Sequence, residues 1–386
     1  MKVWYIMSKE LGQFFTINEG LQQYVFDRVK HKGSLLLEPS FGAGHLLKKF
    51  VESDSEYPMI CYEIDSSIKP CITIKSQQQL VYCDFMSQQF DTTFKTIVGN
   101  PPYVQKSDGN LYLHFIKKCF ELLDDDGELI FIVPSDFLKL TSASKIISEM
   151  VKYGSFTHFL YPNDENLFDR ASVDVVVFRY EKGIFTERVE VNDTLKYYNV
   201  IDGIVTFTDT PMCGDIVSNV FNVYVGLVSG KDEVYKVPFG NTEILVDEGE
   251  REKFIFTTSF PMGNREIDEH LMENKQVLIE RKIRKFNDGN WFEWGAPRNL
   301  KTIEENLNRP CIYMKNLTRS DVVAFKDKVS YFGGKLLCLI PRCDVNLDKT
   351  IEFLNSHTFK KNYIYAGRFK IGQRQLANAL LSDLKE

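Results

Sequence analysis

Ile97-Val98-Gly99-Asn100-Pro101-Pro102-Tyr103 is the stretch on which the interpretation of the whole chain depends. The β-branched, apolar residues before Gly99 predict a short buried strand. Two prolines then end the strand, because proline fixes φ and has no backbone N–H, and each favours extended geometry in the residue before it. The chain therefore leaves the strand as a stiff tetrad whose distinctive groups are an amide, Asn100, and an aromatic ring, Tyr103.

This tetrad is suited to holding an amino group on a flat ring. Asn100 can accept a hydrogen bond through Oδ1, and the backbone at Pro101 offers mainly carbonyl acceptors. Two acceptors can bind the two hydrogens of an –NH2 group, while Tyr103 stacks on the ring that carries it. The alternative is a plain strand-to-loop breaker, and the accompanying motifs decide between the two.

Composition limits the classes to which the protein can belong. The chain has 386 residues, 44% of them hydrophobic, which is enough for two or three domains with a large core. We see no signal peptide and no apolar run near the roughly 18 residues of a membrane span, so we expect a cytoplasmic protein without a membrane partner. The eight cysteines lack paired spacing, which favours reduced thiols and no metal site.

Four predicted strands in the first half each end in a polar side chain. The strands and their terminal side chains are 34–37 with Glu38, 59–62 with Glu63, 80–83 with Asp84, and 96–98 with Asn100 beyond Gly99. A small-residue turn at 39–44 follows the first strand, although it is neither a full dinucleotide fingerprint nor a P-loop. Ligands bind at the carboxyl ends of strands in open α/β sheets, so the pattern predicts a ligand site there.

The remaining elements complete an α/β pattern, which predicts a doubly wound sheet. The predicted helices are 18–29, 45–52, 111–123 and 142–153. Further strands are predicted at 129–133, 157–160 and 173–180, the last two as a terminal antiparallel hairpin. The acidic segment 124–127 is expected to be a loop.

Taken together, these motifs resemble the gamma class of DNA adenine-N6 methyltransferases, the TaqI type, which serve type II restriction-modification systems. The shared order is Gly-Gln-Phe-Phe-Thr at 12–16, Glu-Pro-Ser-Phe-Gly-Ala-Gly at 38–44, Asn-Pro-Pro-Tyr at 100–103, and then a more basic C-terminal half. The resemblance covers residues 8–181 well and is looser beyond. It implies a Rossmann-like class I methyltransferase domain at 1–190 and an α+β target recognition domain at 191–386.

The resemblance also implies S-adenosylmethionine as the cofactor and a role for each matching residue. The cofactor-binding residues that it implies are Thr16, Glu38, Ser40, Gly42, Gly44, Glu63, Ile64, Asp84, Phe85 and Asn100. The catalytic residues that it implies are Asn100, Pro101, Pro102, Tyr103 and Tyr180. Asn100 and the Pro101 carbonyl would hold N6 of a flipped adenine, with Tyr103 and Tyr180 as its aromatic neighbours.

Double-stranded DNA is the partner that the resemblance implies, although the net charge of −6 argues weakly against nucleic-acid binding. Basic residues gather in two segments of the C-terminal half, 275–285 and 357–374. The DNA contacts predicted from these segments are Arg281, Lys282, Arg284, Lys285, Arg368, Lys370 and Arg374. For each of them a solvated charged face is the alternative.

Other functions use the same tetrad. The substrate could be RNA or a protein glutamine, or the chain could be a non-catalytic DNA-binding specificity protein. Within DNA, cytosine N4 is a similar amine, although that class usually has Ser-Pro-Pro-Tyr. We expect a monomer and a possible cognate restriction endonuclease that acts on the same site; the sequence does not give the recognition site.

Overall fold

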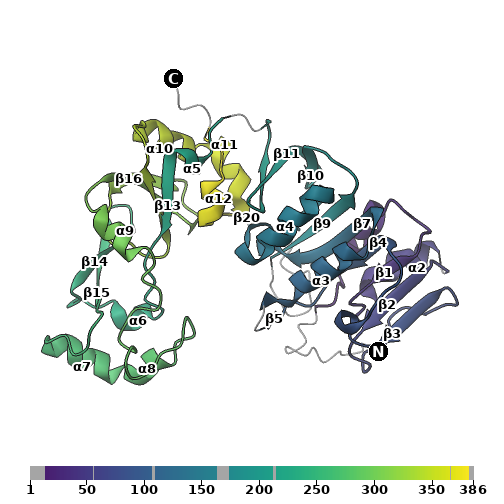
Figure 1. The fold of residues 1–386 in the computed structure, drawn as a ribbon, viewed down its shortest axis with the longest axis horizontal. Coiled ribbons are helices and arrows are strands. Elements are labelled where there is room, and N and C mark those ends of the chain that lie inside the picture. The colour runs from purple at the N-terminus through teal and green to yellow at the C-terminus, as the bar shows by residue number, and fades with distance from the viewer. Residues whose placement is uncertain are drawn as a thin grey trace. The chain divides into compact units, whose positions relative to one another are not determined.

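The computed structural model describes residues 14–54, 56–106, 109–162, 174–211, 214–365 and 367–381. Residues 12 and 13 of the predicted Gly-Gln-Phe-Phe-Thr segment lie outside this description. The chain forms two compact units, Met1–Met212 and Cys213–Glu386 (Figure 1). The first unit extends beyond residue 190, where the sequence predicts its end, because three more strands join its sheet.

The first unit is built on a ten-stranded sheet in the order β12-β11-β10-β8-β9-β7-β4-β1-β2-β3. Strands β3, β2, β1, β4 and β7 are parallel, and β9 runs antiparallel between β7 and β8. The predicted doubly wound sheet is therefore confirmed, and β8 and β9 form the predicted antiparallel pair, but this pair is not terminal because β10, β11 and β12 continue the sheet beyond β8. The strands are β1 (Leu36–Glu38), β2 (Met59–Glu63), β3 (Gln78–Tyr82), β4 (Phe94–Gly99), β7 (Leu123–Pro134), β8 (Gly154–Leu160), β9 (Val175–Lys182), β10 (Arg188–Val191), β11 (Thr194–Ile201) and β12 (Ile204–Thr208). A separate short hairpin pairs β5 (Gln105–Lys106) with β6 (Gly109–Asn110).

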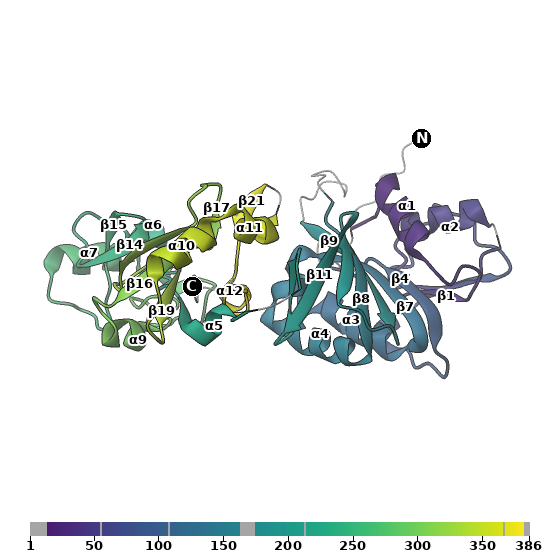
Figure 2. The same cartoon turned by 90° about the horizontal axis from the view of Figure 1, so that it is seen from above.

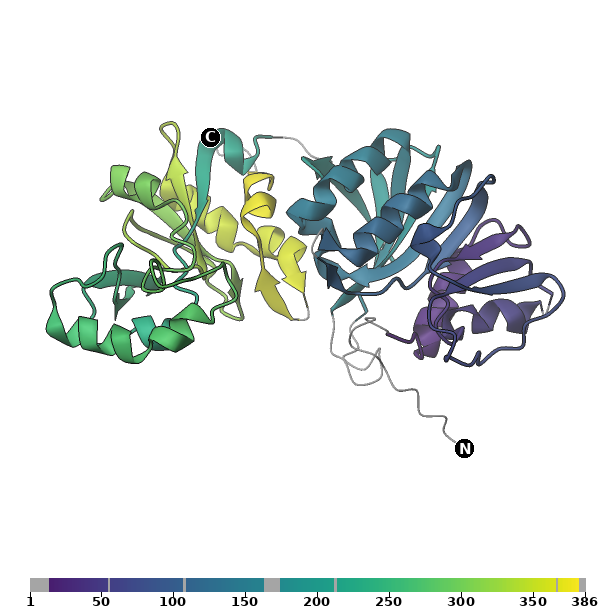
Figure 3. The ribbon, with the colours of Figure 1, turned by 60° about the horizontal axis from the view of Figure 1, so that its bottom comes forward.

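Helices cover both faces of this sheet, with α3 and α4 on one face and α1 and α2 on the other (Figures 2 and 3). The helices are α1 (Glu19–Arg28), α2 (Lys48–Ser53), α3 (Leu111–Glu121) and α4 (Thr141–Tyr153), with 3₁₀ turns η1 (His45–Leu47), η2 (Phe85–Ser87) and η3 (Ser135–Lys139). Successive residues of β7 alternate between the two cores, because side chains of a strand point to opposite faces. Leu129, Phe131 and Val133 face α3 and α4, whereas Ile130 and Ile132 face α1 and α2.

One local prediction is wrong. The acidic segment 124–127, predicted to be a loop, continues strand β7, which begins at Leu123. Phe94 of β4 pairs with Leu123, and pairing resumes between Thr96 and Glu128 after an irregularity in register. An unequal number of residues on the two strands lets the extra acidic residues remain in the strand while their side chains face outward.

The second unit contains a four-stranded sheet in the order β13-β19-β16-β18, whose neighbouring strands are antiparallel. Its strands are β13 (Phe221–Val225), β16 (Pro310–Lys315), β18 (Ala324–Lys328) and β19 (Leu336–Pro341). Two smaller sheets are formed by β14 (Thr242–Asp247) with β15 (Glu250–Phe254), and by β17 (Leu317–Thr318), β21 (Arg368–Lys370) and β20 (Ile364–Tyr365).

Hydrophobic clusters lie on both faces of the four-stranded sheet. Along β16, Cys311 and Tyr313 join one cluster, and Ile312 and Met314 join the other. The helices of the unit are α5 (Val217–Val220), α6 (Asp232–Tyr235), α7 (Arg265–Glu273), α8 (Lys275–Ile279), α9 (Leu300–Glu305), α10 (Leu347–Asn355), α11 (His357–Lys360) and α12 (Gln373–Ala377), with the 3₁₀ turn η4 (Lys361–Tyr363). No helix in the described parts of either unit combines the length and the apolar character that a bilayer crossing requires.

Candidate active site

The carboxyl ends of four parallel strands bring the predicted site residues to one edge of the first sheet. Glu38 ends β1, Glu63 ends β2, Asp84 follows β3 and Asn100 follows β4. A pocket that encloses about 890 Å³ of space, part of it open solvent, lies at this edge. A second, smaller pocket of about 270 Å³ shares five lining residues with the first, so the two adjoin.

The larger pocket gathers most of the predicted residues. Those that line it are Ser40, Gly42, Glu63, Ile64, Asp84, Phe85, Asn100 and Pro102. Sequence reasoning missed the other lining residues, which are Phe14, Phe15, Pro39, Tyr62, Cys83, Met86, Val104, Lys106, Leu111 and Phe115. Several of these residues are next to the motifs in sequence, and that proximity could have identified them. Leu111 and Phe115 are different, because they reach the pocket only through the packing of α3 beside it.

The smaller pocket contains the remaining polar candidates of the first strand end. Thr16 and Glu38 line it together with Ser40, Gly42 and Asn100. Gly44, Pro101 and Tyr103 line neither pocket. The structure thus divides the predicted set into residues that line a pocket and residues that do not.

Glu38 is a carboxyl group in an almost fully buried position. Its exposed fraction is 1%, and Oε1 accepts hydrogen bonds from the Ser40 backbone N–H at 3.0 Å and the Ser40 hydroxyl at 3.1 Å. Desolvation raises the pKa of Glu38 to about 8 despite these two bonds, and the nearby Glu63 adds to the rise. A positively charged ligand group at this position would offset that cost, because it favours the ionised form.

Glu63 organises the turn after β1. Its Oε2 accepts from the Gly42 N–H at 2.6 Å, and its Oε1 accepts from the Asp65 N–H at 2.9 Å. Burial raises the pKa of Glu63, and these backbone donors oppose the rise. Gly44 acts on the same turn through its backbone: its φ is +83°, and a Cβ there would lie 2.5 Å from the Phe41 ring.

Asp84, Phe85 and Ile64 form one end of the larger pocket. Asp84 is exposed and its Oδ1 accepts from the Met86 N–H at 2.9 Å, which caps η2. Phe85 is buried, whereas Ile64 leaves 58% of its surface exposed at the pocket edge. An apolar surface beside a carboxylate suits a flat heterocycle that carries a hydrogen-bond donor.

Asn100 is held in place by hydrogen bonds on both sides of its amide. Nδ2 donates to the Phe14 carbonyl at 2.7 Å and to the Thr16 hydroxyl at 3.1 Å, while Oδ1 accepts from the Tyr103 hydroxyl at 2.6 Å. The carbonyl oxygen of an amide has two lone pairs, so Oδ1 retains one acceptor position. Among the described residues, no donor reaches the backbone carbonyl of Pro101.

Tyr103 makes contacts that the sequence does not reveal. Its ring stacks on Phe14 with centroids 5.0 Å apart and an interplanar angle of 28°, and its edge contacts Tyr112 at 6.3 Å. Its hydroxyl lies 3.1 Å from the Ile132 carbonyl as well, which is the longer of the two acceptor contacts open to its single proton. Burial keeps the pKa of Tyr103 well above its ordinary value, so the hydroxyl remains a donor.

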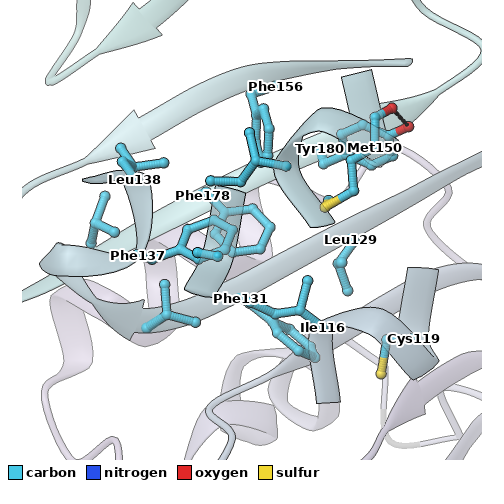
Figure 4. Close-up of a cluster of buried hydrophobic side chains, with 14 of the residues drawn as sticks. Ile116, Cys119, Leu129, Phe131, Phe137, Leu138, Met150, Phe156, Phe178 and Tyr180 are labelled. Atoms are coloured by element: carbon cyan, nitrogen blue, oxygen red, sulfur yellow. Dashed lines mark hydrogen bonds between the residues drawn. The ribbon is translucent and has the colours of Figure 1, made fainter. Parts of the chain in front are cut away.

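Tyr180 is not part of this site, which corrects the prediction that it is a second aromatic neighbour of the target. It lies on β9 on the same face as Phe178, fully buried under α3 and α4 (Figure 4). Its ring contacts Phe120 and Phe156, and its hydroxyl donates to the Met150 carbonyl at 2.7 Å. Tyr180 is a core residue with a satisfied hydroxyl, and it lines neither pocket.

The prediction that Arg281 contacts DNA is also wrong, because its guanidinium forms hydrogen bonds inside the second unit. Its N–H groups donate to the carbonyls of Leu278, Ser229, Trp291 and Glu293 at 2.6–3.0 Å. Only 7% of the residue is exposed. A cation that holds four backbone carbonyls together is a structural group and is not available to a DNA phosphate.

The other basic candidates occupy surface positions of the second unit. Lys282 and Lys285 are exposed, whereas Arg284 donates to Glu293 Oε2 at 2.6 Å and to the Trp294 carbonyl at 3.0 Å. Arg368 and Lys370 lie two residues apart on β21 and therefore share the face opposite buried Phe369. Arg374 is half-buried on α12.

Where the structure describes the chain, it contains no group of three or more His, Cys, Asp or Glu side chains that could hold a metal ion.

Comparison with known proteins points to one class of enzyme. Residues 55–168 match the model of the Eco57I restriction-modification methylase family. Type II methyltransferase M.HincII of Haemophilus influenzae is 28% identical over 203 residues, which cover 47% of this chain and 39% of that relative. Type II methyltransferase M.TthHB8I of Thermus thermophilus is 24% identical over 365 residues, covering 84% of this chain and 79% of that protein.

A solved structure extends the likeness in fold to both units. The Type IIL restriction-modification enzyme MmeI in complex with DNA matches 94% of this chain and 64% of its own chain, with a TM-score of 0.52 and 9% sequence identity. At such low identity the match concerns the fold alone. The chain matches less than two-fifths of the length of M.HincII and of the related M.HindII.

The family whose model matches residues 55–168 is one of methylases, which implies S-adenosylmethionine as the cofactor. The chain is thus similar to type II restriction-modification methylases, as the order of its motifs predicts.

Proposed function

We propose that the protein is a site-specific DNA methyltransferase that transfers a methyl group from S-adenosylmethionine to N6 of a flipped adenine in duplex DNA. The observation that carries the proposal is Asn100, fixed at the end of β4 with an acceptor position on Oδ1, at the edge of an open pocket. The similarity to type II methyltransferases supports DNA as the substrate class.

The two adjoining pockets suit the parts of S-adenosylmethionine. In the smaller pocket, Glu38 would bind the ammonium group, whose charge relieves the cost of burying a carboxylate. In the larger pocket, Glu63 would accept from the ribose hydroxyls, while Ile64 and Phe85 would contact the adenine and Asp84 would accept from its amino group. The bound cofactor supplies an electrophilic methyl group on a sulfonium.

The tetrad would prepare the nucleophile. Adenine inside a duplex cannot reach the methyl donor, so the base must leave the helix at a cost of a few kcal/mol. Asn100 Oδ1 and the Pro101 carbonyl would each accept one hydrogen of N6, which moves the nitrogen toward tetrahedral geometry and stabilises the positive charge that develops there. Pro102 keeps the backbone extended so that both acceptors face the same group.

Tyr103 would stack on the flipped base, as part of the same proposal. Phe14 covers one face of its ring at a centroid distance of 5.0 Å, too close to admit a base between the two rings. Entry of the base would therefore move Phe14 away from Tyr103. Asn100 bonds to Phe14 and Thr16 through Nδ2, whereas N6 would bind Oδ1 of the same amide, so these two bonds do not occupy the acceptor.

The second unit would read the DNA sequence. Lys282, Lys285, Arg284, Arg368 and Lys370 are proposed contacts to phosphates and bases, with Arg374 nearby in sequence. We further propose that the enzyme acts as a monomer in the cytoplasm, with a possible cognate endonuclease that cuts the same site.

Labelled methyl transfer with identification of the product tests this function. The purified chain would be incubated with tritiated S-adenosylmethionine and, separately, with duplex DNA, RNA and a release-factor protein. We expect label in DNA alone, recovered as N6-methyladenine after digestion to nucleosides. Recovery as N4-methylcytosine would contradict the choice of base, and label in RNA or protein alone would contradict the choice of substrate. No transfer to any of them, together with binding of DNA, would favour a non-catalytic specificity protein.

A further inference from the structure

We infer that Lys118 of α3 is a positioning residue that fixes the turn η2 on α3, and so places Phe85 and Asp84 in the subsite for the cofactor's adenine. This inference rests on the proposed function, since it assigns a role within the S-adenosylmethionine site. Lys118 lines neither pocket, so it acts through the residues that it holds.

The ammonium of Lys118 binds three backbone carbonyls of one short segment. Nζ donates to Phe85 at 2.7 Å, Met86 at 3.0 Å and Gln88 at 2.7 Å. An ammonium has three N–H donors, so these bonds use all of them. The same cation lies 4.7 Å from the centroid of the Phe85 ring and 5.4 Å from that of Phe90, close enough for cation–π attraction.

The segment bound by Lys118 forms one wall of the pocket. Asp84, Phe85 and Met86 all line the larger pocket, and they belong to or adjoin the single turn η2. The turn also has hydrogen bonds of its own: the Ser87 N–H and hydroxyl donate to the Asp84 carbonyl, and the Gln88 N–H donates to the Phe85 carbonyl at 3.1 Å. Without the cation, the partly desolvated carbonyls of Met86 and Gln88 would lose their donor and that of Phe85 would keep only the Gln88 N–H, so the turn would have to rearrange to satisfy them.

The adjoining part of the pocket lining comes from the helix that carries Lys118. Leu111 and Phe115 of α3 line the pocket, and Phe115 stacks on Phe85 with centroids 5.5 Å apart and an interplanar angle of 29°. Lys118 lies one helical turn after Phe115, so its three bonds tie η2 to the same face of α3. The position of η2 on α3, and with it the position of Phe85 beside the adenine, therefore depends on this one side chain.

The chain offers a matched control for removing this lysine. Lys117 is the adjacent residue of α3, but its side chain is 69% exposed and its ammonium lies 3.9 Å from Glu121. Lys117→Met therefore removes the same type of charge from the same helix without touching the pocket wall. Lys118→Met keeps an unbranched chain that is one atom shorter and removes all three donors, whereas Lys118→Arg keeps a charged donor group.

The experiment compares cofactor binding with catalysis and with DNA binding. Calorimetry gives the Kd for S-adenosylmethionine, steady-state kinetics gives KM and kcat, and a filter assay gives the affinity for DNA. For Lys118→Met we expect Kd and KM for the cofactor to rise at least about 10-fold, as loss of charge-assisted hydrogen bonds implies. We expect kcat at saturating cofactor and DNA affinity to stay close to wild type, Lys118→Arg to recover most of the affinity, and Lys117→Met to match wild type.

Two results would overturn the inference. Lys118→Met with an unchanged cofactor Kd would show that the turn holds its position without the lysine. A parallel loss of kcat, DNA affinity and thermal stability, without a selective rise in cofactor KM, would show a general structural role. If Lys118→Met fails to fold, Lys118→Gln, which keeps one donor group, carries the same expectation. Wild-type protein that does not bind S-adenosylmethionine would contradict the proposed function itself, whereas normal binding by both proteins would contradict only the role of Lys118.

Discussion

Glu38→Gln separates the cost of a buried carboxylate from its use in binding. The structure places Glu38 with 1% exposure and raises its pKa from an ordinary 4.5 to about 8. Glutamine has the same shape, and its Oε1 can still accept from the Ser40 N–H and hydroxyl. We expect the substitution to stabilise the ligand-free protein while weakening its binding of the cofactor.

The size of the stabilisation follows from the two pKa values of Glu38. Below pH 4.5 the carboxyl is neutral in both the folded and the unfolded chain, so the substitution changes little. As the pH rises the unfolded chain ionises first, and folding must keep the group protonated or bury its charge. At about 1.4 kcal/mol for each pH unit, the cost is about 3 kcal/mol at pH 7 and about 5 kcal/mol above pH 8. Glu38→Gln should therefore raise the free energy of unfolding by these amounts.

Urea unfolding at three pH values measures this effect. Far-ultraviolet circular dichroism follows the whole chain, whereas tryptophan fluorescence in a Trp4→Phe background, which leaves Trp291 and Trp294, reports the second unit, where the substitution should have no effect. Glu52→Gln is the control, since Glu52 is an exposed residue of α2 paired with Lys49. Calorimetry should show a loss of cofactor affinity of about 10- to 100-fold in Glu38→Gln, the value of a charged hydrogen bond.

The reasoning on Glu38 would fail on either of two results. A variant that is less stable than wild type at pH 8, or whose stability difference does not grow between pH 5 and pH 8, would show that Glu38 is not a desolvated carboxylate. Unchanged cofactor affinity would show that the ammonium binds elsewhere.

Three further predictions concern residues whose roles the structure revised or left open. Tyr180→Phe should destabilise the protein by about 1–2 kcal/mol, because the hydrogen bond to the Met150 carbonyl is lost, and it should leave kcat unchanged. A large fall in kcat would show that Tyr180 belongs to the active site. Arg281→Met should lower the free energy of unfolding of the second unit by more than about 3 kcal/mol, since four carbonyls lose their donor. Urea unfolding followed by the fluorescence of Trp291 and Trp294 in a Trp4→Phe background measures this, and a stable variant that only binds DNA more weakly would contradict it. The double substitution Lys282→Ala with Lys285→Ala should leave stability unchanged and weaken DNA binding. It should also reduce the slope of log Kd against log salt concentration by about 2. An unchanged slope would show that neither lysine contacts DNA.

The strand ends were predictable because they combine two local signals. An apolar run followed by Glu38, Glu63, Asp84 or Asn100 marks both a buried strand and the polar group at its end, and the parallel order of an α/β sheet brings such ends together. The structure places all four at one edge with an open pocket beside them. Had Asn100 and Pro102 been enclosed in the core, with no hollow beside them, the interpretation would have failed.

The prediction that Tyr180 lies in the active site is wrong, although the alternation of side chains along its strand indicates a core position. It lies two and four residues after Phe178 and Val176, so all three side chains point to the same face of β9. That face is covered by α3 and α4 (Figure 4). The family resemblance implies an aromatic neighbour of the target base near this position. The alternation of side chains along β9 favours a core residue instead, and it is the stronger indication.

Arg281 and Lys118 show what sequence alone cannot supply. Each is a basic residue that binds backbone carbonyls of segments distant in sequence. Arg281 binds the carbonyl of Ser229, and Lys118 binds that of Phe85. Carbonyls are present at every residue, so no pattern of side chains marks the places where several of them converge. Only the packed chain distinguishes such a buried cation from one that faces DNA.

Single-turnover methyl transfer by Asn100→Ala is the most direct test of the proposed mechanism. With saturating cofactor and DNA, we expect the rate to fall by about 10²- to 10³-fold or more, as for loss of a donor or acceptor that acts on the transition state. The Kd for S-adenosylmethionine should change little, and Gln105→Ala, an exposed residue just beyond the tetrad, should behave as wild type. A rate close to that of wild type in Asn100→Ala would contradict the assignment of the acceptor that binds N6, and with it the mechanism.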